Sequence, residues 1–223
     1  MSRRPRRVSP ANCKLLTAYY NPRVHLWRDR LHRWLAPLAR RCPFSPNVVS
    51  VIALLLNATA AWLFYSQRFL IAMAVLVAGG LADAFDGIVA RVQQKESRYG
   101  DFLDHFLDRV SDLLLIAGWL LGNRVRIEIV AAALIAVMLN GYIGTQIEAT
   151  WRERNYDSVG RGEFVLGMVV YPIVSFIFFD NGWNALRFGG LAIAEWMSVV
   201  LIAFAVLGIV QRFALASRLE RGA

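Results

Sequence analysis

Long apolar stretches alternate with short polar segments along most of the chain beyond about residue 45. A helix needs about 20 residues to cross a ~30 Å hydrocarbon core. Backbone polar groups in lipid must be satisfied within the spanning structure, so this pattern predicts an all-α integral membrane bundle of six transmembrane helices. The predicted helices run from Pro46 to Ser66, Phe69 to Ala90, Gly100 to Leu121, Ile129 to Glu148, Glu163 to Phe179 and Leu191 to Ala214.

A different pattern occupies the segment that precedes the first predicted span. Between Tyr19 and Leu38, apolar residues recur at three- and four-residue steps, and arginines fill the gaps. This predicts an amphipathic interfacial helix with its tryptophans in the interface and its arginines toward phosphate headgroups, although packing on another protein is the alternative. We therefore divide the chain into an N-terminal arm (1–45), a six-helix domain (46–215) and a C-terminal tail (216–223).

Composition and charge support a membrane protein. Hydrophobic residues make up 57% of the chain, and 25 Lys and Arg against 16 Asp and Glu give a formal charge of +9. A basic balance suggests either nucleic acid or an anionic membrane surface as a partner. The charges lie at the edges of the apolar stretches, which favours the membrane and not nucleic acid. The two cysteines are too few for a disulfide scaffold and form no CxxC pair, which argues against a zinc or redox site.

The basic residues also predict the orientation of the bundle. Most of them lie in the N-terminal arm and in segments 91–98, 152–161 and 212–221, whereas the opposite connections carry only Arg68, Arg124, Arg126 and Arg187. Because cytoplasmic loops carry the excess of Lys and Arg, we expect both termini in the cytoplasm.

Acidic residues cluster where the second and third predicted helices meet. Asp83 and Asp86 are three residues apart and Asp104 and Asp108 are four apart, so each pair shares a helix face. The short turn between the helices makes them antiparallel neighbours and brings the four carboxylates together at the cytoplasmic side. Ionisable groups inside spanning helices are costly, so such a cluster indicates a functional site. Gly79 and Gly80, earlier in the second helix, would allow close helix packing.

Four neighbouring carboxylates repel one another unless cations lie among them. Oxygen ligands suit hard ions such as Mg²⁺, Mn²⁺ or Ca²⁺, and Mg²⁺ commonly completes its shell with phosphate oxygens. This favours a substrate that carries a diphosphate. Gly87 and Gly100 leave room for a nucleotide or phosphate to approach the backbone. The alternative without enzymatic activity is a set of solvated helix-end carboxylates, or an ion path in a cation channel or transporter.

The same residues resemble the signature of the CDP-alcohol phosphatidyltransferases, D-x2-D-G-x2-A-R-x8-G-x3-D-x3-D. The pattern is met without a gap by Asp83, Asp86, Gly87, Ala90, Arg91, Gly100, Asp104 and Asp108. The wider resemblance covers an interfacial helix, a Ser-Pro-Asn start to the first span and the six spans.

The resemblance implies transfer of a phosphatidyl group from a CDP-linked lipid to a small alcohol at the cytoplasmic face, with release of CMP. It implies one or two Mg²⁺ or Mn²⁺ ions and a homodimer. The metal ligands would be Asp83, Asp86, Asp104 and Asp108, and Asp108 would be the general base. Asp83, Gly87, Ala90, Arg91 and Gly100 would bind the cytidine diphosphate.

The acceptor is less well defined. Leu-Asp-Arg-Val-Ser-Asp after the motif and Gln211-Arg212 near the chain end resemble the branch that makes phosphatidylinositol phosphate and its archaeal ether-lipid counterpart. Arg161 matches the first arginine of that branch's R-x-E-R element, but Phe164 replaces the second. Arg109, Arg161 and Arg212 are therefore candidate acceptor-binding residues, since guanidinium groups bind phosphate bidentately. Flanking positive charge is the alternative for Arg161 and Arg212.

Inositol phosphate and glycerol 3-phosphate are the leading acceptors, and serine or an amino alcohol remains open. A second enzymatic interpretation reverses the roles, with a CDP-amino-alcohol donor and diacylglycerol as acceptor.

Overall fold

The computed structural model describes residues 34–151, 161–183 and 186–222. Within them a short helix over residues 34–41 precedes the long helices. The elements that follow are α3 (Pro46–Tyr65), α4 (Phe69–Val92), α5 (Arg98–Gly122), α6 (Ile127–Trp151), α7 (Arg161–Asp180), β1 (Arg187–Phe188), β2 (Leu191–Ala192) and α8 (Ile193–Gly222). The predicted all-α class is confirmed, with the two-stranded hairpin as a small addition to the described fold.

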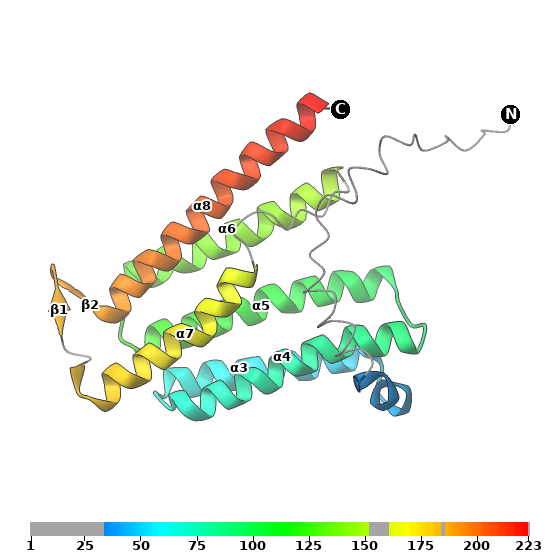
Figure 1. The fold of residues 1–223 in the computed structure, drawn as a ribbon, viewed down its shortest axis with the longest axis horizontal. Helices are drawn as coiled ribbons and strands as arrows, with labels where there is room; N and C mark the ends of the chain where they lie inside the picture. The colour runs from blue at the N-terminus through cyan, green and yellow to red at the C-terminus, as the bar shows by residue number, and fades with distance from the viewer. Residues whose placement is uncertain (1–33, 152–160, 184–185, 223) are drawn as a thin grey trace, which may run out of the picture.

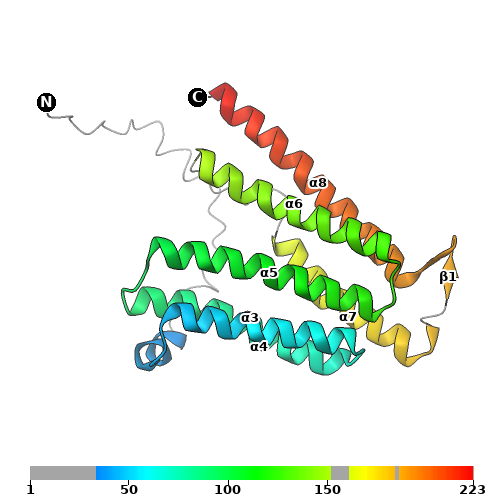
Figure 2. The same ribbon diagram turned by 180° about the vertical axis from the view of Figure 1, so that it is seen from behind.

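The helices run up and down, as their short connections require (Figure 1). The α3–α4 and α5–α6 connections and the β-hairpin lie at one end, and the α4–α5 connection and the end of α8 lie at the other. Helix α3 packs on α4 and α5, and α6 packs on α8. The group formed by α3, α4 and α5 and the pair formed by α6 and α8 are joined by packing of α5 on α6, as the view from behind shows (Figure 2).

Within the described residues, four helices are long and apolar enough to cross a membrane: Pro46–Tyr65, Phe69–Val92, Ile127–Trp151 and Ile193–Arg221. Helix α5 carries the charged motif residues, and the described side chains of α7 include the apolar segment Val169–Asp180. The chain is thus an integral membrane protein, whereas the full set of six spans stays a prediction. The predicted interfacial helix also stays a prediction, because residues 19–33 of it lie outside the described residues.

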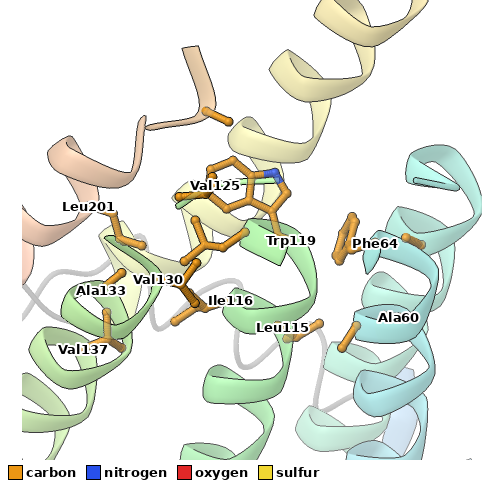
Figure 3. Close-up of a cluster of buried hydrophobic side chains, with 14 of the residues drawn as sticks. Ala60, Phe64, Leu115, Ile116, Trp119, Val125, Val130, Ala133, Val137 and Leu201 are labelled. Atoms are coloured by element: carbon orange, nitrogen blue, oxygen red, sulfur yellow. The ribbon is translucent and has the colours of Figure 1, made fainter. Parts of the chain in front are cut away.

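The largest buried side chains meet toward the end that carries the hairpin (Figure 3). Trp119 and Ile116 of α5 are fully buried there with Phe64 of α3. The Trp119 indole Nε1 donates a hydrogen bond to Ser175 Oγ of α7 at 2.9 Å, and its ring lies 5.2 Å from that of Tyr171. This core holds α3, α5 and α7 together and leaves the acidic residues at the opposite end.

Two glycines allow α5 to approach the backbone of α3. A Cβ added at Gly118 would overlap the Ala61 carbonyl oxygen and lie 2.8 Å from its carbonyl carbon. A Cβ at Gly122 would overlap the Phe64 carbonyl oxygen in the same way. The four-residue spacing places both glycines on one face, as in small-xxx-small contacts between membrane helices. The close approach of α3 and α5 therefore depends on glycine, which has no side chain, at positions 118 and 122.

The helix over residues 34–41 is anchored to the end of α4. Ala39 is buried against Ile88 and Val89, and the Gln93 side-chain amide donates hydrogen bonds to the carbonyl oxygens of Ala39 (3.0 Å) and Cys42 (2.9 Å). This contact places the segment before α3 beside the α4–α5 connection.

The start of the last helix differs from the prediction. Leu191, predicted as its first residue, pairs with Phe188 in the β-hairpin, and the helix begins at Ile193. Gly189 and Gly190 have φ values of 57° and 81°, a backbone region that glycine adopts without steric cost. Apolar composition alone could not show that this glycine pair makes a tight turn.

Candidate active site

The turn between α4 and α5 aligns the acidic residues of the two helices. Helix α5 begins after Ser97, whose hydroxyl accepts a hydrogen bond from the Gly100 amide at 3.0 Å. Serine is a favoured N-cap because its oxygen satisfies an amide of the first turn. On the other side, the Lys95 amide donates to the Ala90 carbonyl at 2.8 Å, which closes the end of α4. Both helix ends are therefore fixed by local bonds within a few residues of the motif.

The structure brings the four predicted carboxylates into one cluster. One ligand atom each from Asp83, Asp86 and Asp104 lies within 4.8 Å of the others. Asp104, His105 and Asp108 form a second such group, and Asp104 joins the two. His105 Nε2 also lies 3.8 Å from Oδ1 of Asp101, which is one turn earlier on α5. Carboxylates from two helices thus converge as the residue spacing predicts.

Asp86 gives the strongest local indication that the carboxylate cluster suits a cation. Its residue is 6% exposed, and its Oδ2 is buried without a hydrogen-bond partner in the described part of the chain. The Ser50 side chain and the Gly87 backbone hydrogen-bond the Asp86 carboxylate, while the carboxylates of Asp104 and Asp108 lie near enough to repel it. A buried charged oxygen without compensation is costly, and like charges at short range add to the cost. The residues present therefore fit a hard divalent cation, whose positive charge would compensate the charge of the carboxylates.

A pocket of about 280 Å³ opens beside Asp86 and Asp104. Its wall includes Gly87, Ala90, Arg91 and Gly100 of the predicted nucleotide-binding set, whereas Asp83 and Asp108 do not line it. The remaining lining residues were not predicted: Pro46, Asn47 and Ser50 of α3, and Lys95, Glu96, Ser97 and Asp101 around the turn. The Ser-Pro-Asn start of α3 was the available signal for the contribution of that helix.

The two glycines of the pocket differ in the space around them. A Cβ at Gly87 would lie 3.6 Å from Arg91 Nη2, which is an ordinary contact. A Cβ at Gly100 would lie 3.1 Å from Ser97 Oγ and 3.3 Å from Asn47 Oδ1, which is tight. Arg91 folds back on its own helix, and its Nε donates to the Gly87 carbonyl at 2.9 Å. The open side of Gly87 therefore faces space that a ligand could use.

The three candidate acceptor arginines come from three different helices, α5, α7 and α8. Arg109 of α5 pairs with Asp112 at 3.2 Å, and Arg212 of α8 donates through Nη1 to the backbone and side-chain oxygens of Asn140 on α6. Arg161 is the first residue of α7, and its side chain lies outside the described part of the structure. The side chain of Arg109 also lies against Gly141 of α6, and that of Arg212 lies against Gly144, so both arginines contact the same region of α6.

A family model for CDP-alcohol phosphatidyltransferases matches residues 44–210. The chain belongs to this family. It is therefore a transferase of phospholipid synthesis, and the resemblance drawn from the acidic motif is confirmed.

This CDP-alcohol phosphatidyltransferase is similar in sequence to curated relatives and in fold to solved structures. It is 29% identical over 182 residues to an archaetidylinositol phosphate synthase of Pyrococcus horikoshii, covering 80% of this chain and 90% of the relative. Its fold matches the Mycobacterium tuberculosis phosphatidylinositol phosphate synthase crystallised with CDP-DAG, with a TM-score of 0.64, 22% identity and coverage of 82% and 92% of the two chains. The same enzyme with manganese and citrate gives a TM-score of 0.60 at 23% identity, covering 80% and 87%.

Proposed function

We propose that this protein transfers the phosphatidyl group of CDP-diacylglycerol to a phosphorylated alcohol, with inositol phosphate as the leading candidate, and releases CMP. The observation that carries the proposal is the carboxylate cluster, with its buried unpartnered Asp86 oxygen beside an open pocket. The Pyrococcus relative, named for synthesis of archaetidylinositol phosphate, supports the choice of acceptor. Glycerol 3-phosphate is the second acceptor that the arginines would suit.

We assign the site residues as follows. Asp83, Asp86, Asp104 and Asp108 hold one or two divalent ions, and the manganese in the Mycobacterium structure supports a metal of this type. A divalent ion held by these carboxylates would neutralise charge on the diphosphate and on the departing CMP. Gly87, Ala90, Arg91 and Gly100 form the wall against which the nucleotide lies, together with Asn47 and Ser50.

The reaction is a substitution at the β-phosphorus of the donor. The acceptor hydroxyl oxygen forms a new bond to this phosphorus, while the bond to the bridging oxygen breaks and its electron pair leaves with CMP. Asp108 accepts the hydroxyl proton as general base. Arg109, Arg161 and Arg212 bind the acceptor phosphate, whose position next to Asp108 fixes the orientation of the attacking hydroxyl.

We further propose that the site faces the cytoplasm, with six spans, both termini on that side and a homodimeric assembly. The α4–α5 connection and the end of α8 lie at the same end of the molecule (Figure 1), as this orientation requires. The positively charged flanks at this end supply the sequence support.

An acceptor panel tests the proposal directly. Detergent-purified protein receives labelled CDP-diacylglycerol with inositol phosphate, glycerol 3-phosphate, inositol or serine, and lipid products are separated and counted. We expect product with a phosphorylated acceptor, CMP in equal amount, and no product in EDTA. Transfer to serine or unphosphorylated inositol would contradict the acceptor proposal. Product only from a CDP-amino-alcohol donor and diacylglycerol would support the reversed roles instead.

A further inference from the structure

Two glycines on α6 lie against the side chains of two arginines from other helices. A Cβ at Gly141 would overlap Nη1 of Arg109 and lie 3.1 Å from its Cδ and 3.3 Å from its Cζ. A Cβ at Gly144 would lie 3.2 Å from Cζ, 3.3 Å from Nε and 3.4 Å from Nη2 of Arg212. The glycines are three residues apart and therefore share a helix face. That face is occupied by guanidinium groups.

Asn140 adds a polar contact beside this face. Its backbone oxygen and its side-chain Oδ1 both accept from Nη1 of Arg212. Arg109 is restrained by its own helix, because its Nη2 forms an ion pair with Asp112 Oδ2 at 3.2 Å. Each guanidinium is thus held by an oxygen acceptor and bordered by a glycine. Two guanidinium cations, one from α5 and one from α8, thus lie against neighbouring positions of α6 and suit a doubly charged anion that both can contact.

The surroundings of these glycines differ from those of the helix-packing glycines. At Gly118 and Gly122 the nearest atoms are the backbone of α3, so an added methyl group would push two helices apart. At Gly141 and Gly144 the nearest atoms belong to the outer part of a long, flexible side chain. An added methyl group there would displace an arginine and leave the helices in place. The α6 glycines are therefore placed to control where the guanidinium groups lie.

We propose that Asn140, Gly141 and Gly144 form an arginine seat on α6 that positions Arg109 and Arg212 for the phosphate of the acceptor. The inference rests on the proposed phosphorylated acceptor. The three seat residues act through the arginines and are positioning residues. The absence of side chains at Gly141 and Gly144 fixes the separation of the two charges, and with it the size of the anion that both can bind.

The test measures the KM values of the two substrates in the full-length protein. We expect Gly141→Ala to raise the KM for inositol phosphate about 10-fold, as a displaced bidentate contact would, while the KM for CDP-diacylglycerol changes less than about 2-fold. Gly144→Ala should raise the KM for inositol phosphate by a smaller factor, because its added Cβ would lie farther from the arginine. Gly80→Ala is the matched control, because a Cβ there meets nothing within 4 Å. Gly80→Ala should leave the KM values for inositol phosphate and for CDP-diacylglycerol unchanged.

A double-mutant cycle separates positioning from a general effect on the helix. In an Arg109→Ala background the guanidinium is absent, so Gly141→Ala should cost nothing further. A full additional penalty in that background would overturn the inference. The inference would also be overturned if Gly141→Ala left the KM for inositol phosphate unchanged while Arg109→Ala raised it. In that case the proposed function would still stand. If Arg109→Ala and Arg212→Ala both leave the KM for inositol phosphate unchanged, the proposed acceptor site fails and the seat fails with it. Thermal melts of each variant identify any that do not fold. If Gly141→Ala does not fold, the same measurements on Gly144→Ala and Arg212→Ala test the inference.

Discussion

Replacement of Gly87 by alanine should move stability and activity in opposite directions. A Cβ at this position would lie 3.6 Å from Arg91 Nη2, so the folded protein accommodates it without rearrangement. Glycine inside a helix is less favourable than alanine by about 0.5–1 kcal/mol, so Gly87→Ala should raise the free energy of unfolding by up to that amount. The same methyl group would project into the pocket where we place the nucleotide.

The cost to activity follows from the loss of that space. An extra methyl group in a well-fitted contact costs about 1–3 kcal/mol, which predicts a rise of roughly 5- to 150-fold in the KM for CDP-diacylglycerol. Thermal melting in detergent and CMP release at varied donor concentration measure the two effects. Gly80→Ala makes the same chemical change on α4 away from the pocket, and should show the gain in stability alone. A Gly87→Ala protein that melts earlier than wild type, or that keeps the wild-type donor KM, would refute the reasoning.

Two further substitutions probe the cluster and the helix contacts. Asp86→Asn removes a buried charge that lies near Asp104 and Asp108 and has one oxygen without a hydrogen-bond partner. It should stabilise the metal-free protein in EDTA while lowering turnover at least about 100-fold. An active variant with normal metal dependence would exclude Asp86 as a ligand. Gly118→Ala would force α3 and α5 apart at Ala61 and should lower the free energy of unfolding by about 1–3 kcal/mol, read as an earlier melt in detergent. An unchanged melt would show that the two helices can separate there at no cost.

Much of the helical fold could be predicted because the apolar stretches have membrane-spanning length. The carboxylate cluster could also be predicted, since helical spacing aligns Asp83 with Asp86 and a short turn brings α4 and α5 together. These features depend on local geometry and on residues near one another in the sequence. The β-hairpin at Gly189 and Gly190 interrupts an apolar stretch, and its turn depends on backbone angles that composition does not reveal.

Contacts between distant segments could not be predicted in the same way. Asn47 and Ser50 reach the pocket only because α3 packs beside α4 and α5. Gly79 and Gly80 look equivalent in the sequence, but only Gly79 meets another helix, at Asn57. The pairing of Arg212 with Asn140 joins residues that are 72 positions apart. Each of these contacts depends on which faces of the helices meet, and one sequence does not determine that.

The central claim is that the aspartates hold a divalent ion that binds the diphosphate of the donor. Calorimetric titration of the purified protein with CDP, with and without Mn²⁺, tests this most directly because it requires no acceptor. We expect CDP to bind only when Mn²⁺ is present, and Asp86→Asn to abolish both metal and CDP binding. Equal CDP affinity in EDTA and in Mn²⁺, or no Mn²⁺ uptake by the wild-type protein, would contradict the account.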